Sequence, residues 1–465
     1  MRKKPIFVLV AVLLSSVSLP MTLTGASVAL SDIAADLGAQ LAPVQWVVNG
    51  YNATFASFML AAGSLADLVG RRRVYASGVA VFAVTGVLSI VATNIVLLDI
   101  VRAIAGAGAA AAAASGAALL ASSFEGPARA RVFGLFGTTL GVGLAFGPTI
   151  AGLLISAFGW RMVFGLPAAA ALIVLAMVPL LPESRDSTAR RIDTGGAVTF
   201  TLSLLLLITG FVEGPSLGWT SPLPLAAFAI SVVLFVTFVG IERRKPDPMF
   251  DLGLLSSPRF LAFSTAAATI LCVLIPLLIY LPSYFTQVLE MSPQQAGAIL
   301  IMLTAPTLVL PSLSGLITKW VPPAAIVILS VVMVGVGAAW LALAGPKTGT
   351  LGLAGPLLTI GLGVGASTGL IDGVAISSVS VDRAGTAAGM LNTARLASET
   401  VAIAVCGAVL AATTEGRLTD PGFTEGLQVV LWSMAGLALL SMLLCALMLR
   451  GGPAARQPAA ESVSA

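Results

Sequence analysis

Residues 63–73 read Gly63-Ser64-Leu65-Ala66-Asp67-Leu68-Val69-Gly70-Arg71-Arg72-Arg73, and they join an apolar stretch at 44–66 to another at 74–93. Each stretch has the roughly 20 apolar residues that a helix needs to cross a membrane. Anchoring of the loop on the cytoplasmic side accounts for the three arginines. It accounts neither for Asp67 nor for the two glycines, which allow close helix approach or a tight turn. The stretch therefore predicts two membrane helices joined by a short, specialised loop.

The same apolar pattern continues along the chain, which is 58% hydrophobic and 9% charged. Soluble proteins carry about a quarter charged residues, so most of this surface must face lipid. Helices are the expected spanning elements, because barrel strands would be short and alternating. Fourteen spans are predicted: 6–30, 44–66, 74–93, 96–120, 131–157, 163–181, 196–212, 222–241, 260–283, 294–317, 323–343, 350–378, 387–411 and 427–449.

The distribution of Lys and Arg predicts the orientation of these spans. If the N-terminus is cytoplasmic, most of the 24 basic residues fall in cytoplasmic segments, with Arg161, Lys347 and Arg417 outside and Arg102 and Arg395 within spans. This asymmetry fits the positive-inside rule. We therefore expect a multi-pass membrane protein with both termini in the cytoplasm. The first apolar stretch, at 5–30, is too long for a cleaved signal peptide.

Two polar loops, 182–195 and 242–259, bracket spans seven and eight. They predict an N-terminal six-helix half at 1–181, an inserted helix pair within 182–259 and a C-terminal six-helix half at 260–449. The tail at 450–465 is rich in Gly, Pro and Ala, and we expect it to be disordered.

The composition also excludes several classes of function. The chain has no His, and its three Cys lie in apolar runs, so neither a metal site nor a disulfide framework is expected. No nucleotide-binding Gly-x-x-x-x-Gly-Lys-Ser/Thr motif is present, so ATP is not the expected energy source. We therefore expect no cofactor, no metal, no enzymatic activity and no nucleic-acid partner.

Spans four and five hold two further motifs. Arg102 lies inside span four, where a charge is costly and usually functional. Asp99 is three residues earlier, and a structural ion pair between the two is the alternative interpretation. Span five carries a stripe of small residues that lets a neighbouring helix approach, together with a proline that bends the helix. The stripe consists of Gly134, Gly143, Gly147, Pro148 and Gly152.

In this order and spacing, the motifs resemble those of the major facilitator superfamily, and most closely its drug:proton antiporter branch with fourteen spans. Segments 45–51, 160–161 and 389–395 extend the resemblance over about residues 15–450. It implies an all-α integral membrane fold, in which two six-helix halves flank an inserted central pair. A transport site would lie between the halves, near the middle of the membrane.

The resemblance also implies roles for the motif residues. In the 63–73 loop, formed around Gly63, Asp67, Gly70 and Arg71–Arg73, Asp67 would approach a helix N-terminus of the other half and help close the cytoplasmic side. Leu68 stands where the family often has a basic residue. Arg102 would couple protons to substrate by contacting span one. The glycine stripe of span five would form the hinge between the halves and indicates export.

Span one departs from the family pattern, because Thr22 stands where an aspartate is common. A hydroxyl group cannot carry a proton reversibly at physiological pH, so another carboxylate is needed. Glu399, near the middle of span thirteen, is the first candidate, and Asp372 in span twelve is the second. Asp372 has an alternative interpretation as a partner for Arg395. Two further candidates, Asp32 and Glu213, are expected near the outer ends of their spans.

The sequence thus predicts a secondary transporter that exports an amphipathic drug-like or natural-product compound in exchange for protons. Substrate-cavity candidates are Thr22, Asn49, Asn392 and Arg395. Expected partners are the organic substrate, protons and membrane lipids, and a monomer is expected. Three alternatives stay open: an exporter or flippase of lipid-like molecules, an uncoupled facilitator, and a non-transporting membrane receptor.

Overall fold

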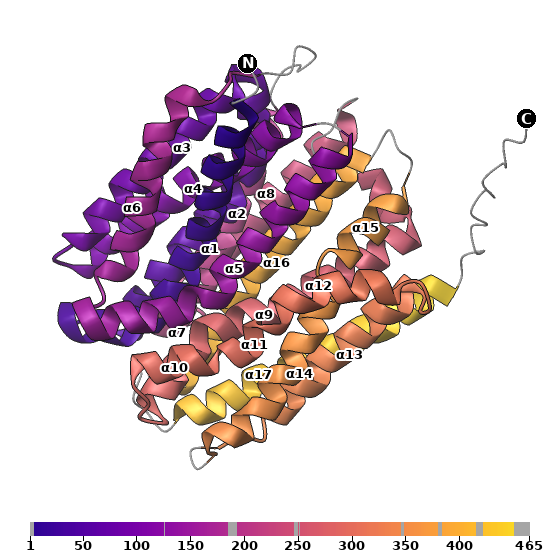
Figure 1. Ribbon diagram of the computed structural model, residues 1–465. Helices are drawn as coiled ribbons and strands as arrows, with labels where there is room; N and C mark the ends of the chain where they lie inside the picture. Colours follow the sequence, from indigo (N-terminus) through magenta and orange to yellow (C-terminus); the bar gives the residue numbers. More distant parts are fainter. Residues whose placement is uncertain are drawn as a thin grey trace, which may run out of the picture.

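The computed structural model describes residues 4–124, 126–184, 193–245, 250, 252–345, 348–379, 384–414 and 422–450. Its regular elements are helical throughout these ranges (Figure 1). A helix satisfies its backbone groups internally, which lipid requires of a spanning segment. The predicted all-α membrane fold is therefore confirmed. The tail at 451–465, Arg190 and Arg417 lie outside the described residues.

The first six long helices pack together and are called the N-terminal bundle. They are α1 (Lys4–Leu37), α2 (Leu41–Val69), α3 (Arg71–Ile90), α4 (Ile95–Ser123), α5 (Gly126–Phe158) and α6 (Met162–Met177), and a short η1 (Val178–Leu180) follows them. Within this bundle, α4 packs between α2 and α3, and α1 packs against α5 and α6. The face of the molecule at which α1 begins is called the near face, and the opposite face is called the far face.

The last group of helices is called the C-terminal bundle. It comprises α9 (Pro258–Gln287), α10 (Pro293–Ile299), α11 (Ile301–Thr304), α12 (Pro306–Ile317), α13 (Pro323–Leu341), α14 (Thr350–Ser367), α15 (Leu370–Ser377), α16 (Ala384–Thr413) and α17 (Gly422–Arg450), and η2 (Leu252–Ser256) precedes it. Here α9 packs against α16 and α17. Cys445, near the end of α17, donates to the Ala262 carbonyl near the start of α9. The chain therefore returns to the near face.

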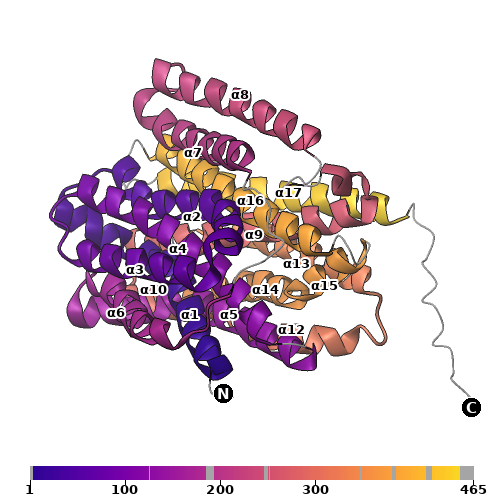
Figure 2. The same ribbon diagram turned by 90° about the horizontal axis from the view of Figure 1, so that it is seen from above.

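Between the bundles in sequence lie α7 (Thr194–Leu217) and α8 (Pro222–Arg244). Seen from above, they sit on one side of the molecule, with α8 outermost (Figure 2). Helix α7 packs against α2 and α16 and thus contacts both bundles. Helix α8 packs mainly on α7, and Val232, Val233 and Val236 remain 60–64% exposed. Apolar side chains exposed to this extent on a long helix are suited to lipid.

Within the described residues, thirteen helices are long and apolar enough to span a membrane, or fourteen if the bent α2 counts as one span. The two parts of α2, Pro43–Met59 and Ala61–Val69, meet at 51°. Two spans predicted as single helices are broken. The segment at 294–317 forms α10, α11 and α12, and α12 starts at Pro306, which lacks the backbone donor that a continuing helix needs. The segment at 350–378 breaks at Gly369, whose φ of +77° no helix permits.

Candidate functional site

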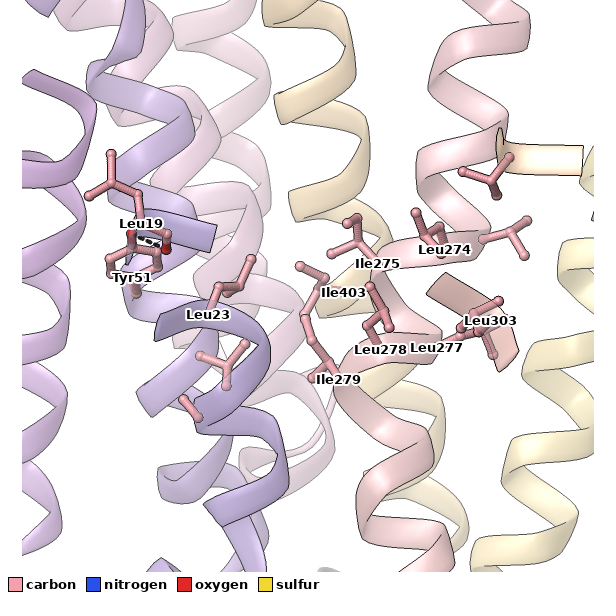
Figure 3. Packing of buried hydrophobic residues seen from close by; sticks show 14 of the residues in the cluster. Leu19, Leu23, Tyr51, Leu274, Ile275, Leu277, Leu278, Ile279, Leu303 and Ile403 are labelled. Carbon is pink, nitrogen blue, oxygen red and sulfur yellow. Dashed lines mark hydrogen bonds between the residues drawn. The ribbon is translucent and has the colours of Figure 1, made fainter. Parts of the chain in front are cut away.

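The two bundles meet toward the far face. Ser27 of α1 donates to the Leu278 carbonyl of α9 at 2.8 Å. Further hydrogen bonds join Ser31 to Thr286 at 3.4 Å, Gln45 to the Gly407 carbonyl at 3.1 Å, Asn52 to Thr400 at 2.9 Å, Thr149 to the Gly297 carbonyl at 2.8 Å and Thr304 to the Ala145 carbonyl at 3.1 Å. Leu23 of α1 lies on the side facing Ile279 and Ile403 of the other bundle (Figure 3). These contacts are called the far-face interface.

Glycines bring the helices close enough for this interface to form. A Cβ added at Gly152 of α5 would collide with the Pro293 carbonyl oxygen of α10. A Cβ added at Gly297 would lie 2.9 Å from the Pro148 carbonyl carbon. The glycine stripe of span five therefore packs against the other bundle at its far end. Closer to the start of α5, Gly143 and Gly147 approach α1. An added Cβ there would collide with the Val17 carbonyl and the Thr24 hydroxyl, respectively. Gly134 also lies in α5.

Replacing Gly297 with leucine is expected to open the far-face interface. Overpacking costs about 1–3 kcal/mol, which corresponds to roughly a five- to 150-fold change in the equilibrium between joined and separated bundles. Cysteine at Ser27, in a cysteine-free background, reports the change by its rate of maleimide modification in detergent. Gly436→Leu is the matched control, because a Cβ there meets no atom within 4 Å. Equal rates in both variants would contradict the expectation.

Arg102 is the largest fully buried side chain, and it lies within the N-terminal bundle. Its Nε donates to the Val47 carbonyl of α2 at 3.0 Å, and its NH1 donates to the Thr22 hydroxyl of α1 at 3.3 Å. The guanidinium lies 4.3 Å from the centre of the Tyr51 ring and 5.2 Å from that of Phe164. Aromatic faces attract a desolvated cation. Arg102 thus links α4 to α1, α2 and α6.

Among the described residues, no ion pair is formed between Arg102 and Asp99, which was the alternative interpretation. The Asp99 Oδ1 atom is buried and has no hydrogen-bond partner among the described residues. Thr22 therefore occupies the place beside the guanidinium that a carboxylate would take in the family pattern. The acceptor is neutral here, because a hydroxyl group takes the place of a carboxylate.

Glu399 and Arg395 lie one turn apart on α16. Arg395 forms an ion pair with Asp372 at 2.6 Å, in agreement with the alternative interpretation of Asp372. Asp372 lies in the first turn of α15, and its side chain is 41% exposed. Glu399 is only 6% exposed, near the middle of α16. Arg395, Asp372 and Glu399 are called the Glu399 group. Glu399 is its buried member.

The other two acidic candidates lie toward the far face. Trp46 donates its indole N–H to Glu213 at 2.8 Å, so this carboxylate links the end of α7 to the start of α2. Asp32 lies in the last turns of α1, which continues to Leu37 rather than ending near residue 30 as predicted. Neither acid belongs to the Glu399 group.

The 63–73 loop is held within its own bundle. Gly70 has a φ of +123°, and an added Cβ would lie 2.8 Å from the Glu183 carboxylate, so this position requires glycine. Arg72 and Arg73 approach Glu183 at 3.5 and 3.8 Å, and Asp67 pairs with Arg71 at 2.8 Å. Gly63 lies inside α2, and a Cβ there would meet no atom of the described residues within 4 Å, so it makes neither the tight turn nor, within the described residues, the close helix approach that were the two alternatives.

The remaining cavity candidates differ in their surroundings. Asn49 of α2 is 1% exposed, and its amide lies beside the Tyr280 hydroxyl of α9, which donates its own hydrogen bond to the Ile403 carbonyl. Asn392 is exposed on α16, two turns before Glu399. A buried amide with part of its hydrogen-bonding capacity unused is costly, so Asn49 is suited to binding a polar group that enters the protein.

The charged residues that sequence reasoning missed include one group at each face of the molecule. Glu183 holds the arginine loop, as described above. At the far face, Arg161 pairs with Asp36 at 2.8 Å, and the Trp160 indole also donates to Asp36, at 3.2 Å. The signal in the sequence was weak: Glu183 and Asp36 each follow the predicted end of a span by a few residues. Their partners are distant along the chain, so spacing could not identify them.

A family model described as Major Facilitator Superfamily matches residues 12–403. Among curated relatives, the multidrug resistance protein Stp of Mycobacterium tuberculosis is 30% identical over 83% of this chain and 72% of its own length. The probable actinorhodin transporter of Streptomyces coelicolor is 31% identical over 82% and 68%. The puromycin resistance protein pur8 of Streptomyces alboniger is 28% identical over 89% and 83%.

Solved structures are similar in fold. A crystal structure of the peptide transporter POT has a TM-score of 0.71 and 14% identity, and the match covers 95% of this chain and 94% of that one. A crystal structure of the nucleoside transporter NupG has a TM-score of 0.66 and 15% identity over 96% and 100%. At this level of identity, the likeness describes the arrangement of helices alone.

Proposed function

Because the chain belongs to the Major Facilitator Superfamily, we propose that this transporter exports an amphipathic drug-like or natural-product compound in exchange for protons. The observation that carries export of such compounds is the similarity to multidrug and antibiotic resistance proteins over four fifths of the chain. The resemblance drawn from the motifs is thereby confirmed at the level of the family.

Proton exchange requires a group that binds and releases a proton within the membrane. Glu399 supports this part of the proposal, since it is buried near the middle of α16 with Arg395 one turn away. An ionised carboxylate at membrane depth costs roughly 2.5–3.5 kcal/mol, so its protonation responds to any change in its surroundings. The nearby pair of Arg395 and Asp372 provides such surroundings, because an arginine released from its partner would be free to stabilise Glu399.

Substrate would be bound between the bundles and released by alternating access. The far-face interface joins the bundles in the present arrangement, and Asp67 is engaged with Arg71 of its own bundle. We assign this arrangement to a state in which the substrate site would be open to the near face and closed at the far face. Asn49, Asn392, Arg395 and Thr22 are the proposed substrate contacts. In the opposite state, Asp67 would meet a helix N-terminus of the C-terminal bundle.

Replacing Asp67 with asparagine is expected to impair transport with little change in stability. A partly exposed ion pair contributes about 0.2–1 kcal/mol, so thermal unfolding in detergent should change little. Transport should fall, because a neutral amide interacts less with a helix N-terminus and with arginine. Initial rates in proteoliposomes check this, and unaltered transport by well-folded variant protein would reduce the motif to a topological signal.

The near face is assigned to the cytoplasm because it carries the basic loop Arg71–Arg73 and the end of α8 with Arg243 and Arg244. Both termini would then be cytoplasmic in a bacterial inner membrane. Single cysteines near Arg73 and Arg244, in a cysteine-free background, test the orientation in intact cells. Modification of either one by an impermeant reagent applied from outside would overturn the assignment.

The proposed activity is tested with purified protein in liposomes that carry an imposed pH gradient. Puromycin, methylenomycin A and actinorhodin are the first probes, since relatives are named for them. Accumulation that requires the gradient and disappears with a protonophore is the expected result. Transport at the same rate with and without the pH gradient would support an uncoupled facilitator. Binding of a probe without its transfer across the liposome membrane would contradict transport.

A further inference from the structure

A cavity of about 520 Å³ lies in the seam between the α7–α8 pair and the C-terminal bundle. It is called the seam cavity, and it lies beside the Glu399 group, because its lining includes Cys272 and Ser398. Phe200 and Leu204 of α7 line one side, Cys272 of α9 and Cys406 of α16 line the back, and Met434 of α17 lines the other side. Its volume is within the range of sites that hold a small organic molecule, about 300–1,000 Å³.

The lining of the seam cavity is apolar and includes no charged residue. Its few hydroxyl groups come from serines, and two of them are already bonded. Ser203 donates to the Ser231 carbonyl at 2.9 Å, and Ser433 donates to the Val429 carbonyl at 2.7 Å. A ligand with a charged or strongly polar group would therefore lose its hydration without compensation. The lining is suited to a hydrocarbon.

The shape and position of the seam cavity narrow the choice of occupant. On α16 its lining runs from Ala397 to Val409, which is roughly 18 Å along the helix. This length lies within the membrane's hydrocarbon core of about 30 Å. The mouth opens to the lipid side, since Phe235 and Leu437 are 51% and 41% exposed whereas Cys406 is 7% exposed. The molecules at that mouth are lipid acyl chains.

We propose that the acyl chain of a membrane phospholipid occupies the seam cavity and completes the packing between α7, α8 and the C-terminal bundle. An empty apolar cavity stays dry, and its walls lose the dispersion contacts that a hydrocarbon would supply. Added packing contacts matter most at α8, because this helix lies outermost in the molecule and packs mainly on α7 (Figure 2). The bound chain adds packing between α8 and α17, which are not among the principal pairs of packed helices in the described part of the chain.

Native mass spectrometry of protein purified in mild detergent tests the proposal. Wild-type protein is expected to retain one phospholipid. Ala402→Phe places a ring inside the seam cavity and should lose it. The matched control, Ala176→Phe, changes an exposed alanine of α6 and should retain the lipid. Equal retention by all three proteins would indicate loosely associated lipid only and would overturn the proposal, as would a wild-type protein that retains none.

A second measurement needs no variant and covers the case in which Ala402→Phe does not fold. Protein is stripped of lipid, and the modification of Cys406 by N-phenylmaleimide is followed with and without added phosphatidylglycerol vesicles. Lipid is expected to slow the modification. If puromycin slows it and lipid does not, the seam cavity is a substrate site and the lipid assignment is wrong. Neither result depends on whether transport is coupled to protons, so the proposed function is tested separately.

Discussion

Replacing Glu399 with glutamine is expected to reduce proton-driven accumulation of substrate to the level of protein-free liposomes, while exchange of substrate for substrate continues. Glutamine keeps the shape of the buried side chain but cannot bind and release a proton. The site at the middle of α16 should therefore fold normally and lose only its response to the pH gradient. The measurement compares puromycin uptake under an imposed gradient with exchange of preloaded puromycin at equal pH.

Two other acids provide the comparison for this result. Asp372→Asn removes the partner of Arg395 and is expected to weaken coupling without abolishing it. Glu213→Gln alters a carboxylate that accepts from Trp46 toward the far face, and its coupling should remain intact. If Glu399→Gln, Asp372→Asn and the double variant all keep a full response to the gradient, the assignment of Glu399 is wrong.

Replacing Arg102 with alanine is expected to lower the free energy of unfolding by on the order of 3 kcal/mol. The change removes hydrogen bonds to Val47 and Thr22 and the cation–π contact with Tyr51, all from a side chain that is 2% exposed. It also leaves a void among four helices of the N-terminal bundle. Thermal unfolding in detergent measures the loss, and a fluorescent thiol probe reports it as an earlier transition.

The controls for Arg102 separate its structural contacts from a role in coupling. Thr22→Val removes one hydrogen-bond acceptor and should cost only about 1 kcal/mol. Arg102→Lys keeps the charge but loses the forked geometry, so it should retain more stability than the alanine variant. An unchanged or higher stability of Arg102→Ala would mean that desolvation of the cation outweighs its contacts, as happens for some buried charges. A Lys variant with full stability and altered pH dependence of transport would support coupling.

The membrane fold could be predicted from the sequence because runs of apolar residues directly determine spans. The breaks at Gly369 and around α11 could not, since a glycine or proline only permits a break and the packing of neighbours decides it. Pro148, for example, lies inside a continuous α5, whereas Pro306 begins a new helix. The bend in α2 has no proline or glycine at the break between Met59 and Ala61, and Gly63 follows only two residues later.

The candidate sites were predicted less completely. Arg102 and Glu399 could be singled out because a charge within an apolar run stands out from its neighbours. The partners that define their surroundings come from other helices, and sequence spacing alone favoured Asp99 beside Arg102, where the structure places Thr22. Glu183 was missed for the same reason, since it meets Arg72 across more than 100 intervening residues.

The far-face interface has a further consequence for how turnover depends on the medium. Its hydrogen bonds come from serine, threonine, asparagine and glutamine, and most end on backbone carbonyl oxygens. Mobile ions screen charges and leave such neutral bonds largely unaffected. Water can also replace each bond as the interface opens, at little net cost. The opening step on this side should therefore proceed at nearly the same rate in dilute and concentrated salt.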